Sequence, residues 1–356
     1  SSLTMVGFKA NRITQVPGSA LPPLLRWLIL TDNCISELPS ELGARPHLQK
    51  LMLAGNQLQR LPDSLQHCHR LELIRVAANQ LTELPEWLLT LPSLTWLAYA
   101  GNPLETEADA ALLESTAVIP WPALRLEQQL GEGASGVIHR ATWTRPGAGE
   151  LPVAVKLYKG EMTSDGSPLH EMNACITAGE HPNLIRVEGR IVDHPQAQAG
   201  LVMELIEPSF RNLAGLPSLD SCSRDVYADH TRFSASVALR IAGAIASVAE
   251  HLHRQGITHG DLYGHNILFN ERGDCLLGDF GAASFHAKSD SVQSRAVQRL
   301  EVRAFGVLLG ELLERIDSDL TAQGRERLEQ LQQRCCQAQV MERPGFGEVV
   351  RVLQDL

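Results

Sequence analysis

The chain has 356 residues, of which 44% are apolar and 20% are charged, and its formal net charge is −10. This length allows two or three domains. The acidic balance argues against a nucleic acid or an anionic membrane as a partner, because those surfaces attract clustered Lys and Arg. No apolar run approaches the roughly 20 residues that span a bilayer.

Two features of the composition bear on location and origin. The seven Cys lack the even number and the spacing of a disulfide framework, so we expect reduced thiols and a cytoplasmic location. Arg greatly outnumbers Lys, a bias typical of GC-rich genomes, and on this ground we expect a bacterial protein.

A pattern of apolar residues and asparagine repeats through the first third of the chain. One copy reads Leu25-x-x-Leu28-x-Leu30-x-x-Asn33. The asparagine of each copy marks the period, at Asn11, Asn33, Asn56, Asn79 and Asn102. The pattern resembles the leucine-rich-repeat family over about residues 3–105. The resemblance implies short strands on a concave face, Leu side chains in a shared core, and Asn side chains that bind backbone groups where each strand ends.

The concave face of such a solenoid carries its recognition residues. Aromatic, Met and Arg side chains are typical anchors of protein interfaces. We expect a protein partner or substrate to bind here, or this face to dock on the chain's own second domain, and the alternative is a passive surface. The expected contact residues are Trp27, Ile29, Met52, Leu73, Arg75 and Trp96. Beside them runs a row of small residues, Thr31, Ala54, Ala77 and Ala100. A short helix at 107–115 is expected to cap the repeats.

Three glycines, Gly131, Gly133 and Gly136, stand between two strand-like segments. A lone G-x-G-x-x-G is weak evidence, because glycines punctuate many turns. A dinucleotide fingerprint would open a helix, whereas here a second strand follows. Gly lets backbone N–H groups approach a phosphate without a Cβ in the way, so we expect a loop that covers phosphates.

The chemistry-bearing motifs follow in a fixed order. They are Val153-Ala154-Val155-Lys156, Glu171, His259-Gly260-Asp261, Asn266 and Asp279-Phe280-Gly281. Asn266 and Asp279 offer the hard oxygen ligands that Mg²⁺ binds, and Asp261 can orient an attacking hydroxyl or accept its proton. This order and spacing resembles the protein-kinase family, and the resemblance spans about residues 124–356.

The resemblance implies ATP and Mg²⁺ as cofactors, with an ion pair between Lys156 and Glu171 that fixes the lysine on the phosphates. The implied catalytic set is Lys156, Glu171, Asp261, Asn266 and Asp279. The implied metal ligands are Asn266 and Asp279. The implied ATP-binding set is Gly131, Gly133, Gly136, Ile138, Ala154, Lys156, Met203, Glu204, Ile206 and Leu268.

The predicted fold class is therefore multidomain, α/β plus α+β, with a leucine-rich-repeat solenoid followed by a two-lobed protein-kinase-like fold. We place the repeat domain at 3–118, a proline-containing linker at 119–123 and the kinase-like domain at 124–356. The kinase-like domain divides into an N-lobe at 124–203 and a C-lobe at 207–356.

The catalytic loop departs from the family pattern at three positions. Gly260 replaces the usual Arg that pairs with a phosphorylated activation loop, which suggests an activity that this phosphorylation does not gate. Tyr263 stands where serine/threonine kinases place a Lys that meets the γ-phosphate. His265 stands where many tyrosine kinases place an Arg. We expect a neutral His265, and a charged His265 that partly substitutes for the missing cation is the alternative.

Two parts that hold protein substrates are short or missing. The segment after Gly281 lacks Ala-Pro-Glu, so Arg343, which resembles the arginine of the late RPxF motif, needs a new partner or is exposed. The segment 317–324 leaves almost no room for the usual extra helix. We therefore expect peptide docking to be absent or delegated to the repeats.

These residues favour an ATP- and Mg²⁺-dependent protein kinase, Ser/Thr slightly over Tyr, whose repeats recruit a protein. A pseudokinase scaffold that binds ATP and a partner is the first alternative, permitted by Tyr263 and the missing Ala-Pro-Glu. A small-molecule phosphotransferase is the second, favoured by His259-Gly260-Asp261. Transfer of label to protein separates the first function from the other two.

Overall fold

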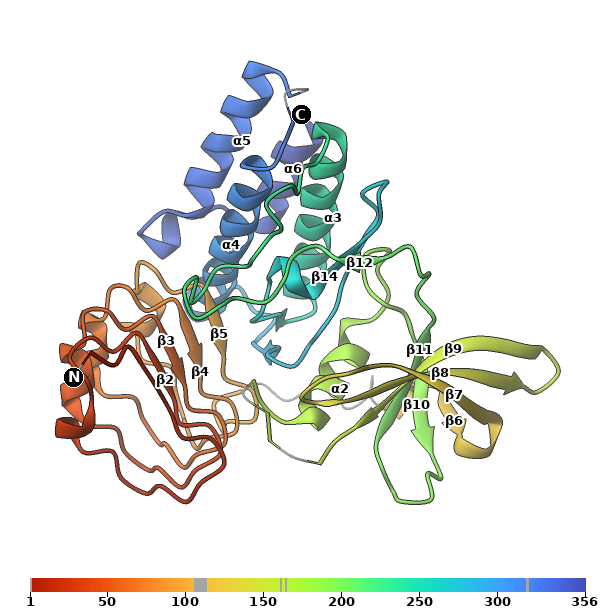
Figure 1. Ribbon diagram of the computed structural model, residues 1–356, viewed down its shortest axis with the longest axis horizontal. Helices are drawn as coiled ribbons and strands as arrows, with labels where there is room; N and C mark the ends of the chain where they lie inside the picture. Colours follow the sequence, from red (N-terminus) through yellow and green to blue (C-terminus); the bar gives the residue numbers. More distant parts are fainter. Residues whose placement is uncertain (1, 106–113, 161, 164, 318–319) are drawn as a thin grey trace.

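The computed structural model describes residues 2–105, 114–160, 162–163, 165–317 and 320–356. Figure 1 shows a strand-rich repeat region, a sheet that carries one helix, and a helical lobe between them. The cap helix expected at 107–115 lies largely outside the described residues.

The repeat region forms one parallel sheet whose strands follow the order of the sequence. The strands are β1 (Met5–Gly7), β2 (Trp27–Ile29), β3 (Lys50–Met52), β4 (Leu73–Arg75) and β5 (Trp96–Ala98). The chain returns through 3₁₀ helices η1 (Gly18–Ala20), η2 (Ser40–Ala44), η3 (Asp63–His67) and η4 (Leu88–Thr90). The expected role of the asparagines is confirmed at Asn56, whose side chain accepts from the Ile35 N–H at 3.0 Å and donates to the carbonyls of Leu30 and Leu53 at 2.9 Å.

A mixed sheet builds the N-lobe, with strand order β6-β10-β11-β9-β8-β7. Its strands are β6 (Val118–Pro120), β7 (Leu124–Glu132), β8 (Gly136–Arg145), β9 (Gly149–Tyr158), β10 (Val187–Val192) and β11 (Gly200–Glu204). Helix α2 (Pro168–Ala178) packs beside it, and η5 (Trp121–Ala123) connects β6 to β7. The expected linker at 119–123 is therefore partly a strand: β6 pairs in parallel with β10 at the sheet edge, where a proline without an N–H is tolerated.

Helices dominate the C-lobe. They are α3 (Ala235–Arg254), α4 (Val292–Leu313), α5 (Ala322–Cys335) and α6 (Phe346–Gln354), with η6 (Gly264–Asn266) and η7 (Val340–Glu342). Short strands frame the catalytic loop: β12 (Arg211–Asn212), β13 (Ile257–Thr258), β14 (Ile267–Phe269), β15 (Cys275–Leu277) and β16 (Ser284–Phe285). Ser234, Ser291 and Thr321 cap α3, α4 and α5 by accepting backbone N–H groups, as N-cap residues do.

Helix α3 is the one described helix that is long and apolar enough to span a membrane. Half of that window is buried inside the protein. Ile241, Ile245 and Leu252 lie in the main core of the C-lobe. This burial is what the core helix of a folded lobe requires.

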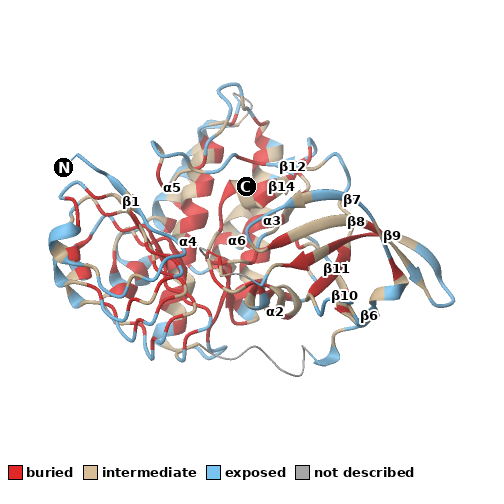
Figure 2. Cartoon of the chain, turned by 60° about the horizontal axis from the view of Figure 1, so that its bottom comes forward, coloured by how far each residue is buried: buried red, intermediate tan, exposed pale blue. Residues whose placement is uncertain are grey.

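The repeat region and the C-lobe share their cores. Val297 and Leu300 of α4 pack into the leucine core of the repeats, while Trp96 and Leu73 of the repeat strands belong to the core of the C-lobe. Figure 2 shows the buried residues of the repeat strands adjoining those of α4. Contacts of this kind resemble the interior of one domain more than a transient interface between two.

Arg343 also connects the C-lobe to the repeat region. Its side chain is fully buried, and its guanidinium donates to the carbonyls of Gln337 at 2.8 Å, Arg299 at 3.2 Å and Pro92 at 3.0 Å. Burial lowers the pKa of Arg343 to about 10. Carbonyl oxygens, one of them from the repeat region, thus replace the carboxylate that the sequence lacks.

Candidate active site

The glycine loop joins β7 and β8, which pair antiparallel as the sequence predicts. A Cβ atom at Gly131 or Gly133 would meet nothing within 4 Å, whereas one at Gly136 would lie 2.6 Å from the Leu157 carbonyl oxygen. The first two glycines therefore border open space that suits phosphate groups, and Gly136 is needed for close strand packing.

Lys156 on β9 and Glu171 on α2 form the expected ion pair. Glu171 is almost fully buried, at 2% exposed. Burial alone would lower the pKa of Lys156, but the charge and hydrogen bond of Glu171 outweigh it and raise that pKa. Lys156 therefore stays cationic, as a lysine that holds phosphate oxygens must.

The catalytic loop holds Asp261 and Asn266 side by side. The Asn266 amide nitrogen donates to the Asp261 carbonyl at 2.9 Å and to its Oδ2 at 2.8 Å. Burial would raise the pKa of Asp261, but Arg75, His265 and His259 together lower it. Asp261 is thus an ionised carboxylate that can accept a hydrogen bond from a hydroxyl.

Glu301 of α4 binds the backbone of the catalytic loop. Its Oε1 accepts from the Gly260 N–H at 2.7 Å, and its Oε2 pairs with His253 Nε2 at 2.7 Å. Gly260 has φ 72°, and a Cβ there would lie 2.3 Å from the Ala282 carbonyl oxygen and 3.0 Å from that of Leu97. The positive φ and the nearby carbonyls, that of Ala282 in the C-lobe first and that of Leu97 in the repeats second, therefore leave no room for the arginine that the family pattern places at this position.

Asp279 lies near the ion pair of Lys156 and Glu171. It adopts φ 55°, a strained conformation for a residue with a side chain, and its Oδ1 accepts from the Gly281 N–H at 3.1 Å. The charge of Asp279 contributes to raising the pKa of both Lys156 and Glu171. The structure thus brings Lys156, Glu171 and Asp279 together, as the sequence predicts.

The residues fit a nucleotide with Mg²⁺. Asn266 uses its amide nitrogen within the loop, which leaves its Oδ1 for a cation, and Asp279 offers a carboxylate nearby. Among the described residues, no three His, Cys, Asp or Glu side chains form a metal cluster. Two protein ligands suit Mg²⁺, which completes its shell with phosphate and water.

Most of the remaining predicted ATP contacts lie on strands of the N-lobe sheet. Ala154 lies opposite Met203 in the β9–β11 pair, and Ile138 lies opposite Lys156. Leu268 lies on β14 in the C-lobe. The Glu204 N–H donates to the Arg186 carbonyl at 2.9 Å. Because this N–H is already bonded, the backbone group of Glu204 that remains for adenine is its carbonyl. The roles of Met203, Glu204, Ile206 and Leu268 stay predictions.

The surroundings of His265 favour its charged form over the neutral form that we expected. Burial would lower the pKa of His265, but its hydrogen bond to Asp225 and the charges of Asp261, Asp225 and Asp279 raise it. His265 Nδ1 lies 2.6 Å from Asp225 Oδ1, and its Nε2 lies 3.9 Å from Asp261 Oδ2. A sequence pattern could not reveal this, because Asp225 belongs to a distant irregular segment.

The strands of the repeats meet the C-lobe at this loop, and the C-lobe is one of the two occupants that the sequence left open. Trp96 stacks on Tyr263 with ring centroids 4.1 Å apart, Arg75 binds Asp261, and Leu73 and Met52 pack on the C-lobe core. Trp27 and Ile29 lie at the other end of the sheet and are partly exposed. Sequence reasoning selected Arg75 as a contact residue but did not place it in the catalytic site.

The row of small residues in the repeats allows another segment of the chain to pack closely against them. Ala54, Ala77 and Ala100 are buried, and a Cβ at Gly55 would lie 2.9 Å from Met162 Cγ. A Cβ at Gly166 would lie 3.3 Å from the Ala77 Cβ. Small side chains thus allow the segment between β9 and α2 to lie directly against the repeats.

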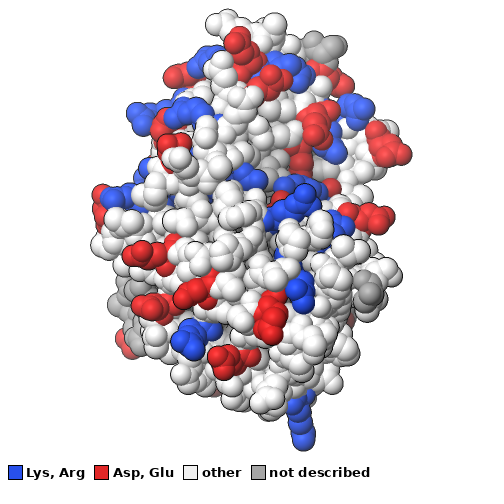
Figure 3. All heavy atoms as spheres, turned by 90° about the vertical axis from the view of Figure 1, so that its left-hand side faces the viewer, with Lys and Arg blue, Asp and Glu red and all other residues white. Residues whose placement is uncertain are grey.

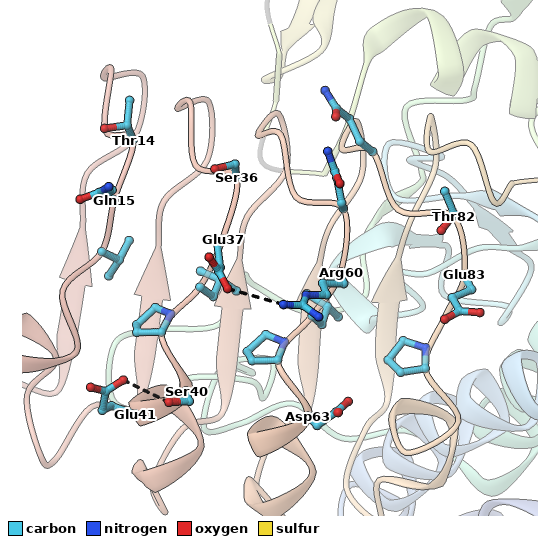
Figure 4. Close-up of a pocket in the computed structure, with 18 of the residues that line it drawn as sticks. Thr14, Gln15, Ser36, Glu37, Ser40, Glu41, Arg60, Asp63, Thr82 and Glu83 are labelled. Carbon is cyan, nitrogen blue, oxygen red and sulfur yellow. Dashed lines mark hydrogen bonds and ion pairs between the residues drawn. The ribbon is translucent and has the colours of Figure 1, made fainter.

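A depression lies wholly within the repeat region. A groove of about 1450 Å³ runs across successive repeats, and Figure 4 shows equivalent polar residues along it. Within it, Arg60 and Glu37 approach to 3.8 Å as an exposed pair, which contributes little to stability. None of the predicted catalytic residues lines this groove.

On the face of the molecule shown in Figure 3, basic and acidic side chains are interspersed rather than separated by sign.

Glu105 joins the end of the repeats to both lobes. Its Oε2 lies 2.8 Å from His170 Nε2 on α2, and its Oε1 accepts from the Phe285 N–H at 2.8 Å. The hydrogen bond to Glu105 raises the pKa of His170, and burial opposes it more weakly.

This junction predicts a pH-dependent stability. Because the pKa of His170 is raised on folding, its contribution is complete below the ordinary pKa of about 6.5 and is lost as pH rises through the folded value. His170→Gln should therefore lower the free energy of unfolding by about 1 kcal/mol at pH 5.5 and by less at pH 9. Urea unfolding at both pH values measures this, and a loss that is equal at both would contradict it.

Together these features match the geometry that phosphoryl transfer needs: a lysine–glutamate pair beside a glycine loop, an ionised carboxylate in the catalytic loop, and two side chains whose oxygen atoms suit a cation. The chain belongs to the protein tyrosine and serine/threonine kinase family, whose profile matches residues 124–306. A leucine-rich-repeat profile matches residues 46–104.

Three relatives illustrate the similarity. Cyclin-dependent kinase 11.1 of Caenorhabditis elegans is 29% identical over 55% of this chain and 26% of its own length. Serine/threonine-protein kinase PITSLRE of Drosophila melanogaster is 29% identical over 51% of this chain and 18% of its own length. Non-receptor tyrosine-protein kinase TNK1 of Mus musculus is 32% identical over 46% of this chain and 23% of its own length. The chain thus spans less than a third of each relative. These relatives are eukaryotic, so the bacterial origin is not confirmed and stays a prediction.

Proposed function

We propose that this chain is an ATP- and Mg²⁺-dependent protein kinase that transfers phosphate to Ser or Thr in preference to Tyr. The observation that carries the proposal is the ion pair between Lys156 and Glu171 beside Asp279. This pair is the arrangement that an active kinase needs to hold its nucleotide. The preference for Ser and Thr rests on relatives such as the serine/threonine kinase PITSLRE. The relative TNK1 is a tyrosine kinase and argues for Tyr instead.

Bound ATP and Mg²⁺ would supply the transferable phosphoryl group and neutralise its charge. The chain's own residues would hold and orient the reacting groups. Lys156 would bind phosphate oxygens, and Asn266 and Asp279 would hold the cation. Asp261 would position the acceptor hydroxyl. Positioning and electrostatics account for most of the catalysis in this reaction class.

The repeat solenoid is proposed to recruit a protein partner or substrate in the cytoplasm. Trp27 and Ile29 remain partly exposed, and the groove in Figure 4 offers polar groups at regular spacing. Because Leu73, Arg75 and Trp96 lie against the C-lobe, recruitment is assigned to the exposed strand residues at the N-terminal end of the repeats and to this groove. Seven free thiols fit a cytoplasmic location.

The test is incubation with labelled ATP and Mg²⁺, with Asp261→Asn as the matched variant, because it keeps the shape of the side chain and removes its charge. Label on Ser or Thr that is absent from Asp261→Asn supports the proposal. ATP binding without any transfer indicates a scaffold. ATP turnover without labelled protein indicates a small-molecule acceptor.

A further inference from the structure

Arg75 of β4 reaches from the repeat region into the catalytic loop. Its side chain is 1% exposed. Nε donates to Asp165 Oδ1 at 2.8 Å, Nη1 donates to the Gly260 carbonyl at 2.8 Å, and Nη2 binds Asp261 Oδ1. Asp165 lies between β9 and α2, whereas Gly260 and Asp261 belong to the C-lobe. One guanidinium therefore ties the N-lobe to the catalytic loop.

The charges around Arg75 keep it cationic. Burial would lower its pKa, but Asp261 and Asp165 outweigh burial and raise it. Burial raises the pKa of Asp165, and the charges of Asp261 and Asp279 raise it further. Without Arg75, the carboxylates of Asp165 and Asp261, which come from the two lobes, would repel each other. A guanidinium with five fixed donors suits such a bridge better than an ammonium group.

The contact is built into the core. Trp96 is fully buried and stacked on Tyr263, and its Nε1 donates to the Leu262 carbonyl at 3.1 Å. The Tyr99 hydroxyl donates to the Phe285 carbonyl at 3.1 Å. Releasing the repeats would expose these aromatic side chains to water, so the geometry favours a permanent arrangement over a reversible block.

We propose that Arg75 is a positioning residue of the kinase site, supplying from the repeat region the cation that the catalytic loop lacks at Tyr263. The inference rests on the proposed kinase function. Arg75 fixes Asp261 through Oδ1, and Asp261 Oδ2 accepts a hydrogen bond from the Asn266 amide nitrogen at 2.8 Å. A carboxylate oxygen has two lone pairs, so Oδ2 keeps one for the acceptor hydroxyl. The repeat region thereby becomes part of the catalytic centre.

The experiment compares Arg75→Met and Arg75→Lys with Glu72→Gln in the full chain. Glu72 is a matched control because it also crosses the interface, binding Arg224 at 3.0 Å and Ser223, away from Asp261. Two quantities are measured: the kcat and KM of phosphate transfer, and hydrogen exchange of the amides of 261–266 with Mg²⁺ and a non-hydrolysable ATP analogue.

Arg75→Met should lower kcat about 100-fold while KM for ATP changes less than about threefold, because Arg75 acts through Asp261. Arg75→Lys keeps the positive charge but lacks the planar set of guanidinium donors. Its kcat should therefore be about tenfold higher than that of Arg75→Met. Glu72→Gln should stay within about threefold of the wild type. Exchange at 261–266 should rise in Arg75→Met and stay unchanged in Glu72→Gln.

An unchanged kcat in Arg75→Met, or a higher one, would overturn the inference, and the higher value would indicate that Arg75 blocks the site. If Arg75→Met does not fold, Arg75→Lys carries the same test with a smaller expected loss. If the wild type transfers no phosphate, the proposed function fails, and hydrogen exchange alone then decides whether Arg75 orders the catalytic loop. Equal exchange in all variants would refute that role.

Discussion

Trp96→Ala is expected to lower the free energy of unfolding by about 3–5 kcal/mol. Trp96 has no exposed surface, so its removal loses the burial of a large aromatic side chain and leaves a cavity against Tyr263. It also removes the donor to the Leu262 carbonyl, and an unpartnered buried carbonyl is itself unfavourable. Denaturant unfolding followed by circular dichroism measures the change.

Trp27 provides the control for this variant. It begins β2 as Trp96 begins β5, but it is partly exposed, and its contacts with Lys50 and Met52 lie within the repeats. Trp27→Ala should cost about 1 kcal/mol, the ordinary value for a mutation outside a core. Equal losses in the two variants would show that the interface with the C-lobe does not stabilise the fold. A shared core further predicts one cooperative transition for the whole chain.

Lys156→Met is expected to lower phosphate transfer by at least about 100-fold. The variant keeps the length and the apolar stem of lysine but removes the charge that meets phosphate oxygens. Lys288→Met, an exposed site in the C-lobe, should retain activity within about threefold. Activity of Lys156→Met at the level of Lys288→Met would exclude the role assigned to Lys156.

The same variant should also show a pH-dependent loss of stability. Burial already raises the pKa of Glu171, and Lys156 is the strongest opposing influence. Without Lys156 this pKa rises further, so folding takes up a proton and the free energy of unfolding falls as pH increases. Lys156→Met should therefore be destabilised more at pH 8 than at pH 5.5, and Lys156→Met/Glu171→Gln should remove that difference. Thermal unfolding at the two pH values measures it.

Local patterns predicted the residues that handle phosphate. A glycine loop between strands, a lysine on the next strand and an aspartate before Phe280-Gly281 are each set by neighbouring residues. The order of those motifs along the chain then specified the fold class and the expected pair of Lys156 and Glu171, because a kinase-like lobe places them together. The periodic leucines and asparagines fixed the repeat strands in the same way, since each repeat packs on its neighbour.

Only the tertiary structure decided what meets the catalytic loop. Arg75 binds Asp261 across 186 positions of sequence, and Trp96 donates to Leu262 across 166. No local periodicity sets the register between two regions that fold on separate patterns. The raised pKa of His265 depends on Asp225, which acts against the effect of burial, and the buried Arg343 guanidinium donates to the Pro92 carbonyl. The sequence by itself determined which residues could do the chemistry, and packing of the repeats on the C-lobe determined their surroundings, because burial and charge arise from contacts that span the chain.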